Sequence, residues 1–132
     1  MLLLDTHALV WLVQDDRRLG RRAKGRIAGA SPGSITVSTL SWYEMGCLVQ
    51  RGRIRLSQNL ASQRQSLLEG GMVEQPVSAT IAMDALDLAG LPRDPMDRFI
   101  VATARIIGAV LVTSDERILE WPGELERLDA QS

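Results

Sequence analysis

Short apolar runs alternate along this chain with longer stretches in which apolar residues recur at helical spacing. The runs predict strands at 2–4, 35–38, 72–77 and 109–113. The periodic stretches predict helices at 6–14, 19–30, 41–50, 57–69, 78–89, 94–107 and 116–120. The acidic tail after the last helix shows no clear pattern, and we expect it to be poorly defined.

Helix-capping residues mark several of these boundaries. Ser78 is a favoured N-cap, Asp94 followed by Pro95 is typical of a helix start, and Gly108 ends that helix. Strands that alternate with helices predict a parallel sheet covered on both faces. We therefore expect a single domain over residues 1–132, a three-layer α/β/α sandwich around a central, mainly parallel sheet.

Acidic residues follow two of the predicted strands. Asp5 comes directly after the strand at 2–4, and Asp115 comes shortly after the strand at 109–113. Ligands of open α/β sheets bind beyond the carboxyl ends of the strands, so both side chains are candidate site residues. Each acid also has a structural interpretation, because each can cap the helix that follows it.

Two further acids are candidates for the same site. Glu44 lies in the middle of an apolar helix, where an inward-facing carboxylate needs a partner. It can instead pair with Arg51 or Arg53, or point outward. Asp97 lies in the first turn of the predicted helix 94–107, where the helix dipole favours a negative charge for structural reasons alone.

Carboxylates gathered at one end of a sheet repel one another, and some take up protons unless a cation neutralises them. Mg²⁺ prefers oxygen ligands and keeps several waters, so a few carboxylates can hold it, and Mn²⁺ accepts the same ligands. Zinc is disfavoured, because His7 and Cys47 are the only imidazole and thiol in the chain. The pattern predicts a Mg²⁺ site, which Mn²⁺ can also occupy, at Asp5, Glu44, Asp97 and Asp115.

The charged residues are unevenly distributed although the net charge is only −1. Residues 17–64 carry ten Lys or Arg side chains and one acid, whereas residues 65–132 carry five bases and twelve acids. A basic segment of this kind is typical of polyanion binding, and also of a solvated helix face. The densest cluster comprises Arg17, Arg18, Arg21, Arg22, Lys24 and Arg26.

The single cysteine excludes an internal disulfide, so nothing indicates an oxidising compartment. The N-terminus has no basic segment, and its apolar run is too short for a signal peptide or a membrane span. We therefore expect a cytoplasmic protein without a membrane partner.

Four motifs, in this order, resemble the PIN-domain family and specifically the VapC-type toxin ribonucleases of type II toxin–antitoxin pairs. They are LLDTHALVW at 3–11, STLSWYEMG at 38–46, LPRDPMDRFIVATA at 91–104 and LVTSD at 111–115. Each motif alone is weak, but four in the right order, over nearly the whole chain, are fairly specific.

The resemblance implies a PIN-like fold and a Mg²⁺- or Mn²⁺-dependent endoribonuclease that leaves 5′-phosphate and 3′-hydroxyl ends. Four acids match the metal-binding acids of the family: Asp5, Glu44, Asp97 and, often less critical, Asp115. Thr6 and Thr113 match hydroxyl residues that support the site. Members usually form homodimers, and a cognate antitoxin silences them by laying its C-terminal segment across the active-site groove. The basic cluster at 17–26 then becomes a candidate for holding the RNA backbone.

One position departs from the family pattern. Many members have a histidine two residues before the Asp-Pro-x-Asp-Arg motif, where this chain has Pro92, or Arg93 if the gap differs. All four acids remain, so we expect metal binding to be kept and substrate contacts to differ. Asp94 is favoured as a helix cap over a metal ligand, and His7 as a packing residue over a general base. Burial in the core or in an interface is favoured over base stacking for three aromatic residues, Trp11, Trp42 and Tyr43.

Three other functions fit parts of this pattern. A phosphotransfer receiver domain needs a lysine late in the chain, and the only lysine is Lys24. A phosphatase with Asp-x-Asp after its first strand needs an acid where His7 stands. A catalytically silent PIN-like scaffold that binds RNA or a partner remains the alternative to an active nuclease, although none of the four acids is missing.

Overall fold

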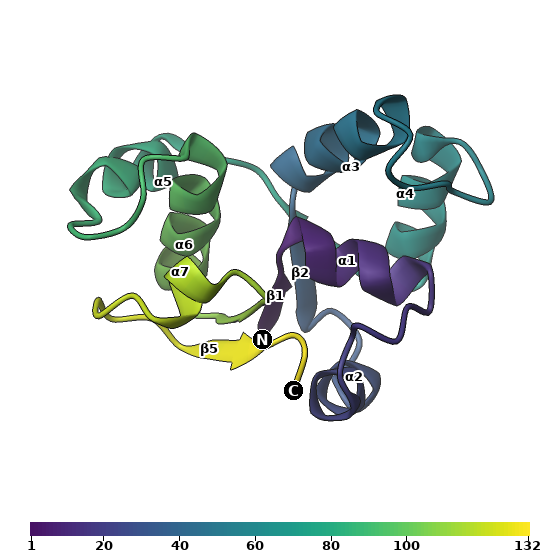
Figure 1. The fold of residues 1–132 in the computed structure, drawn as a ribbon, viewed down its shortest axis with the longest axis horizontal. Coiled ribbons are helices and arrows are strands. Elements are labelled where there is room, and N and C mark those ends of the chain that lie inside the picture. The colour runs from purple at the N-terminus through teal and green to yellow at the C-terminus, as the bar shows by residue number, and fades with distance from the viewer.

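A five-stranded parallel sheet forms the centre of the computed structural model, which describes residues 1–132 (Figure 1). Its strands lie in the order β3-β2-β1-β4-β5, and every neighbouring pair is parallel. The strands are β1 (Leu2–Leu4), β2 (Ile35–Ser38), β3 (Val73–Gln75), β4 (Val110–Thr113) and β5 (Arg127–Asp129). The predicted α/β fold with a mainly parallel sheet is confirmed.

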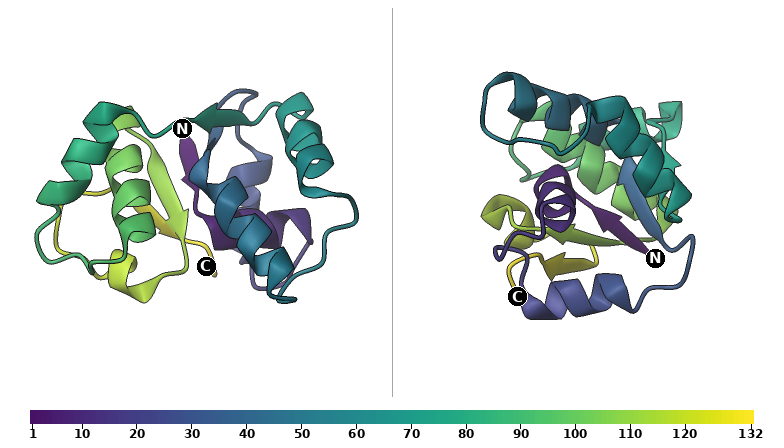
Figure 2. Two further views of the ribbon diagram at one scale, coloured as in Figure 1. Left: turned by 90° about the horizontal axis from the view of Figure 1, so that it is seen from above. Right: turned by 90° about the vertical axis from the view of Figure 1, so that its right-hand side faces the viewer.

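Helices pack against both faces of this sheet (Figures 1 and 2). Four of them share a core with Leu2 and Leu4: α1 (Thr6–Val13), α2 (Arg21–Ala28), α3 (Leu40–Gln50) and α4 (Leu60–Glu69). The others pack with Leu3 on the opposite face: α5 (Ala79–Asp84), the 3₁₀ helix η1 (Ala85–Asp87), α6 (Pro95–Ile107) and α7 (Glu116–Leu119). Successive residues of β1 thus enter different cores, which explains its uninterrupted apolar sequence.

Several predicted elements are shorter in the structure than the sequence suggested. The predicted helix 57–69 begins only at Leu60, because Asn59 accepts a hydrogen bond from the Ser62 N–H at 2.8 Å and acts as the N-cap. The predicted strand 72–77 ends at Gln75, before Pro76, which has no N–H to donate to a ladder.

The expectation of a poorly defined tail was wrong. Residues Arg127–Asp129 form β5, the edge strand that pairs with β4. Leu128 is buried, and the Arg127 guanidinium donates to the carbonyl oxygens of Trp121 and Gly123 at 2.8 and 3.1 Å. A strand this short is specified by its neighbour rather than by its own sequence. Among the helices, none combines the length and the apolar character that a bilayer crossing requires.

Gly20 marks the place where the segment after β5 meets the start of α2. Its N–H donates to the Ala130 carbonyl at 2.8 Å, and a Cβ on Gly20 would overlap the main chain of Gln131 and Ser132. The C-terminal segment therefore packs against a position where only glycine fits.

We expect Gly20→Ala to lower the free energy of unfolding by about 1–3 kcal/mol, because main-chain overlap cannot be relieved by a rotamer change. Gly25→Ala is the matched control, since its Cβ meets nothing within 4 Å inside α2. That variant should raise stability by roughly 0.5–1 kcal/mol. Urea denaturation measures both, and equal effects of the two substitutions would contradict the packing described here.

Candidate active site

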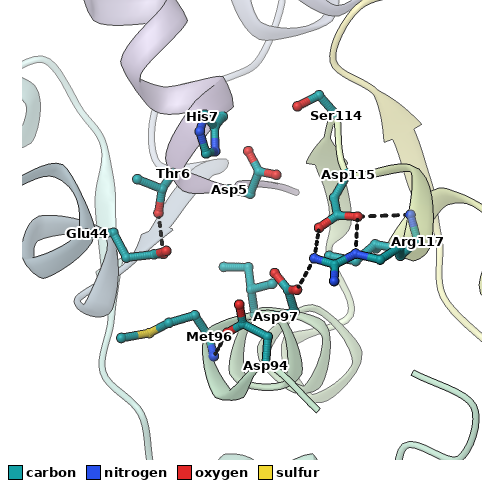
Figure 3. Close-up of a pocket in the computed structure, with 12 residues that line it drawn as sticks. Asp5, Thr6, His7, Glu44, Asp94, Met96, Asp97, Ser114, Asp115 and Arg117 are labelled. Atoms are coloured by element: carbon teal, nitrogen blue, oxygen red, sulfur yellow. Dashed lines mark hydrogen bonds and ion pairs between the residues drawn. The ribbon is translucent and has the colours of Figure 1, made fainter. Parts of the chain in front are cut away.

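The order of the strands places the site between β1 and β4. The chain passes from β1 to β2 and β3 on one side, whereas β4 and β5 lie on the other side, and ligands bind at such a switch point. A cavity of about 310 Å³ lies beyond the carboxyl ends of these strands (Figure 3). It is lined by Asp5, Thr6, His7, Glu44, Asp94, Met96, Asp97, Ile100, Ser114, Asp115, Arg117 and Ile118.

Asp5 caps α1 and also lines the cavity. Its Oδ1 accepts a hydrogen bond from the Ala8 N–H at 2.8 Å. The Thr113 hydroxyl, which accepts from the Asp115 N–H at 3.1 Å, hydrogen-bonds to Asp5 through its own proton. Burial nevertheless raises the pKa of the Asp5 carboxyl, and these hydrogen bonds offset the rise only in part. Capping and a place in the site are therefore compatible for Asp5.

Glu44 reaches the cavity from α3, where the Thr6 hydroxyl of α1 holds it. The Thr6 Oγ1 donates to the Glu44 Oε1 at 2.6 Å and lies 3.1 Å from the Ser41 Oγ. Both hydroxyl residues are buried, so this contact joins α1 to α3 next to the site. Glu44 thus takes a hydroxyl partner rather than Arg51 or Arg53, and only one of its oxygens is engaged.

Asp94 and Asp97 share the start of α6 but have different roles. Asp94 is the N-cap, because its carboxylate accepts from the Met96 N–H at 2.9 Å and Pro95 is the first helical residue. The predicted capping role is confirmed. Asp97 makes no hydrogen bond to the main chain; its side chain is only 19% exposed, faces the cavity and contacts Arg117 at 3.1 Å.

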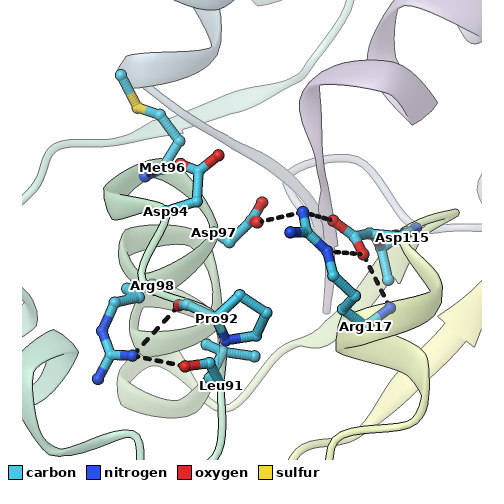
Figure 4. Close-up of polar contacts among 9 residues, drawn as sticks. Leu91, Pro92, Asp94, Met96, Asp97, Arg98, Asp115 and Arg117 are labelled. Atoms are coloured by element: carbon cyan, nitrogen blue, oxygen red, sulfur yellow. Dashed lines mark hydrogen bonds and ion pairs between the residues drawn. The ribbon is translucent and has the colours of Figure 1, made fainter.

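Arg98 fixes the segment that precedes α6 (Figure 4). Its guanidinium donates to five carbonyl oxygens, those of Ala85, Leu86, Leu88, Leu91 and Pro92. A planar guanidinium with five donors suits such a cluster of acceptors, and lysine does not. Arg98 ties residues 85–92 to the first turn of α6 and so positions Asp97 relative to the cavity.

Arg117 connects two acids of the cavity. Its Nη2 lies 3.1 Å from an oxygen of Asp97 and 3.1 Å from an oxygen of Asp115 (Figures 3 and 4). Asp115 is the N-cap of α7 and also accepts from the Arg117 N–H at 2.9 Å. The short helix α7 therefore presents an acid and its counter-ion to the same side of the site.

The two acids that share Arg117 have opposite pKa shifts. Burial and the neighbouring carboxylates of Asp115 and Asp94 raise the pKa of Asp97 to about 6. The charge of Arg117 lowers this pKa by less than burial and these carboxylates raise it. Burial also raises the pKa of Asp115, but its side-chain and main-chain hydrogen bonds with Arg117 outweigh burial, so that the pKa is lowered. Asp97 therefore carries a negative charge that Arg117 offsets only in part.

The donor set of the cavity suits a cation that prefers oxygen. Five carboxylates line the cavity, and Arg117 is the only lysine or arginine in its lining. No three of the His, Cys, Asp and Glu side chains lie close enough together to form a metal site as they stand. The hydrogen bonds explain this separation: Arg117 draws Asp97 and Asp115 to one side, and Thr6 holds Glu44 on another.

The structure does not place the basic cluster of residues 17–26 at this cavity, because none of its side chains contributes to the lining. Arg18 and Lys24 pair with Asp16 and Asp15 on the surface. His7 stands at the rim, exposed, with its ring edge-on to Trp11 at 6.3 Å between centroids.

Sequence reasoning missed three contributors to the site. Arg117 forms the charge bridge, Ser41 contacts the Thr6 hydroxyl, and Ser114 lines the cavity. Arg117 has a recognisable pattern, an arginine two residues after an acid at a helix start. The other two are common polar residues without a distinguishing pattern.

Comparison with known proteins agrees with this geometry. The model of the PIN domain family matches residues 2–123. The chain therefore belongs to the PIN domain family. Ribonuclease VapC22 of Mycobacterium tuberculosis (strain ATCC 25618 / H37Rv) is 34% identical over 117 residues, which cover 88% of each chain. The resemblance to VapC-type toxins is thereby confirmed.

Solved structures share the fold. A toxin–antitoxin complex from Klebsiella pneumoniae superposes with a TM-score of 0.67 at 22% identity, over 98% of both chains. VapC20 of Mycobacterium tuberculosis, a toxin that cleaves the sarcin-ricin loop, superposes with a TM-score of 0.63 at 18% identity, over 88% of this chain and 91% of that one.

The raised pKa of Asp97 makes the stability of the fold depend on pH. The pKa of Asp97 is about 6 in the folded chain and 3.8 in the unfolded chain, so ionising Asp97 destabilises the fold. This destabilisation is absent below pH 3.8 and fully present above pH 6. In EDTA, we expect Asp97→Asn to raise the free energy of unfolding by about 1–2 kcal/mol near pH 8, allowing for the screening of a partly exposed group.

Near pH 3.5 the same substitution should change stability little, because Asp97 is then protonated in the folded state and mostly protonated in the unfolded state. Urea denaturation at the two pH values measures the difference. A gain of equal size at both would show that the substitution acts through packing and not through charge.

Proposed function

We propose that this protein is a Mg²⁺-dependent endoribonuclease and the toxin of a VapC-type toxin–antitoxin pair. The observation that carries the proposal is the gathering of four acids from distant parts of the sequence around one cavity: Asp5, Glu44, Asp97 and Asp115. The 34% identity to a ribonuclease and membership of the PIN domain family support it.

We assign Asp5 and Asp97 as the principal ligands of Mg²⁺, with Asp115 completing the site or holding a second ion. A bound divalent ion lowers the pKa of a coordinated water and offsets negative charge on the phosphate. Carboxylates are the donors that Mg²⁺ and Mn²⁺ accept. The raised pKa of Asp97 supports the assignment, because an under-compensated carboxylate gains most from a cation.

Glu44 acts on the attacking water in this proposal. Thr6 fixes one oxygen of its carboxylate, which leaves the other to orient the water and accept its proton. The water oxygen bonds to phosphorus, the bond between phosphorus and the 3′ oxygen breaks, and that oxygen takes up a proton from solvent. The products carry a 5′-phosphate and a 3′-hydroxyl.

Asp5→Asn and Asp97→Asn should each reduce cleavage of RNA in Mg²⁺ by about a hundredfold or more, because each removes a charged ligand. EDTA should abolish cleavage by the wild type, and Mn²⁺ should restore it. Glu69→Gln at the end of α4 is the matched control, since it makes the same change from carboxylate to amide at an exposed position outside the cavity. Gel analysis of cleaved RNA measures activity, and circular dichroism verifies the fold.

Full activity of both site variants would overturn the assignment of the ligands. RNA binding by the wild type without cleavage in Mg²⁺ or Mn²⁺ would identify the alternative, a catalytically silent scaffold. The insertion of Arg117 between Asp97 and Asp115 is the observation that favours this alternative, because it shows that a side chain can neutralise the acids.

An antitoxin is the protein partner that we infer. The similar structure from Klebsiella pneumoniae is a toxin–antitoxin complex, and its chain matches 98% of this one. The antitoxin would cover the cavity and exclude RNA from it. Co-expression of the product of the adjacent reading frame should suppress cleavage.

We also propose a homodimer, formed through the surface of α5 and η1. Leu86 and Met83 are 78% and 63% exposed, unusually high values for large apolar side chains. Leu86 lines a hollow with Ala82, Ala85, Pro95 and Phe99. An exposed apolar patch of this kind marks an interaction site.

Leu86→Glu should convert the dimer to a monomer, because a carboxylate in an apolar interface is left without a partner. Ile106→Glu is the control, since Ile106 is 44% exposed and does not line this hollow. Light scattering coupled to size-exclusion chromatography measures the mass. A wild-type mass of one chain would contradict the proposed dimer.

A further inference from the structure

A second hollow opens from the acid-lined cavity along α3. It has a volume of about 390 Å³, and it shares five lining residues with that cavity: Thr6, His7, Glu44, Asp94 and Met96. The rest of its lining comes from α3 and the turn that follows it: Tyr43, Cys47, Leu48, Arg51 and Arg53. The cavity and this hollow together form one groove, and we call the hollow the α3 arm. The groove changes from acidic at the cavity to basic along the α3 arm.

Arg51 and Arg53 are held on a fixed turn. The Arg51 N–H donates to the Cys47 carbonyl at 3.0 Å, and the Arg53 N–H donates to the Leu48 carbonyl at 2.9 Å. Between them, Gly52 has a φ of 70°, a left-handed conformation that suits glycine at a helix end. The backbone positions of both arginines are therefore set before any ligand arrives.

Both guanidinium groups are exposed and form no hydrogen bond or ion pair with any other side chain. By contrast, Arg18 pairs with Asp16, and Arg117 is engaged by Asp97 and Asp115. A helix C-terminus favours a nearby cation, but this preference does not require two arginines in the wall of one groove. Arg51 and Arg53 are the unpaired cations next to the acid-lined cavity.

Tyr43 is the exposed aromatic residue of this groove. Its side chain is 65% exposed, whereas Trp11 and Trp121 are buried and the Trp42 indole N–H donates to a Glu74 oxygen. Tyr43 therefore lies outside the core of the chain, and of the burial expected in a core or an interface only the core is excluded. An exposed ring beside unpaired arginines is the combination with which proteins bind single-stranded nucleic acid, by stacking on a base while cations hold the backbone.

We propose that the α3 arm is a subsite for single-stranded RNA, in which Arg51 and Arg53 bind phosphates next to the scissile one and Tyr43 stacks on an unpaired base. The proposal rests on the proposed nuclease function. It restricts the substrate to RNA that is unpaired beside the cleavage site, because a base within a duplex has no free face to offer.

The position of the α3 arm favours RNA over a protein as its ligand. A strand whose scissile phosphate lies among the acids must leave the cavity with its other phosphates attached, and the acids repel them. The α3 arm supplies positive charge where the strand leaves. An acidic segment of a protein partner also complements Arg51 and Arg53, and the experiment below separates the two ligands.

The test uses the Asp97→Asn variant, which keeps the groove and prevents cleavage, with a labelled single-stranded RNA of about 12 nucleotides, a length typical of such sites. Adding Arg51→Gln and Arg53→Gln together should weaken binding by about tenfold. It should also reduce the steepness of the slope of log affinity against log salt concentration by about 1.4, since each lost phosphate contact removes about 0.7 from that slope. Fluorescence anisotropy over a salt series measures both.

The matched control is Arg64→Gln with Arg105→Gln, which removes the same charge from exposed residues that lie outside the groove and outside the basic cluster at 17–26. It should leave RNA binding within about twofold, since distant cations contribute little at physiological salt. Tyr43→Ala should weaken binding by about tenfold, whereas Tyr43→Phe should retain it, because stacking needs the ring and not the hydroxyl. In the cleavage-competent chain, Tyr43→Ala should raise KM more than it lowers kcat.

Unchanged RNA binding after loss of Arg51, Arg53 and Tyr43 would overturn the proposal and leave an acidic protein segment as the ligand that the charge of the α3 arm fits. An equal loss in the Arg64 and Arg105 control would also overturn it, because binding would then follow total charge. The nuclease proposal fails separately. If RNA binding depends on the α3 arm but the wild type does not cleave RNA, the nuclease proposal is refuted and the subsite is supported. If the wild type cleaves RNA and cleavage does not depend on the α3 arm, the nuclease proposal is supported and the subsite is refuted.

Discussion

The pairing of β1 on both of its edges is the constraint on which the site depends. β1 has only three residues, yet it pairs with β2 on one side and with β4 on the other. Leu3 and Leu4 are completely buried in opposite cores, so a shift of one residue would exchange the two faces. This register fixes Asp5 at the carboxyl end of β1, beside the end of β4 that leads to Asp115.

Carboxylates concentrated in this way destabilise the folded chain, and the structure compensates for them unevenly. Asp115 and Asp5 gain hydrogen bonds from helix N-termini, and Arg117 adds a positive charge. Burial still raises the pKa of both Asp5 and Asp97, so neither carboxylate is fully compensated. Uncompensated charge of this kind is typical of functional sites, where a bound cation or substrate reduces the electrostatic repulsion that destabilises the fold.

Local features of the sequence predicted most elements, because caps and apolar runs act within a few residues. Asp94 and Pro95 start α6 as expected, and the strands 2–4 and 35–38 were predicted at their observed boundaries. β5 could not be predicted in this way, since it forms by pairing with β4 and by Arg127 contacts to main-chain carbonyls. Tyr43 lies outside the core because apolar neighbours in sequence do not determine which face of α3 meets the core.

Four motifs of the sequence resembled the PIN-domain family. The sequence by itself also determined that acids follow β1 and β4, that Asp97 lies in the first turn of α6 and that the fold is α/β. These properties depend on backbone periodicity and on the alternation of strands and helices. Only the tertiary structure decided which charges are neighbours. It inserted Arg117 between Asp97 and Asp115, and it placed Arg51 and Arg53 in the wall of the groove while leaving residues 17–26 outside it. The physical reason is that strand order and helix packing, and not distance along the chain, set the separation between charges.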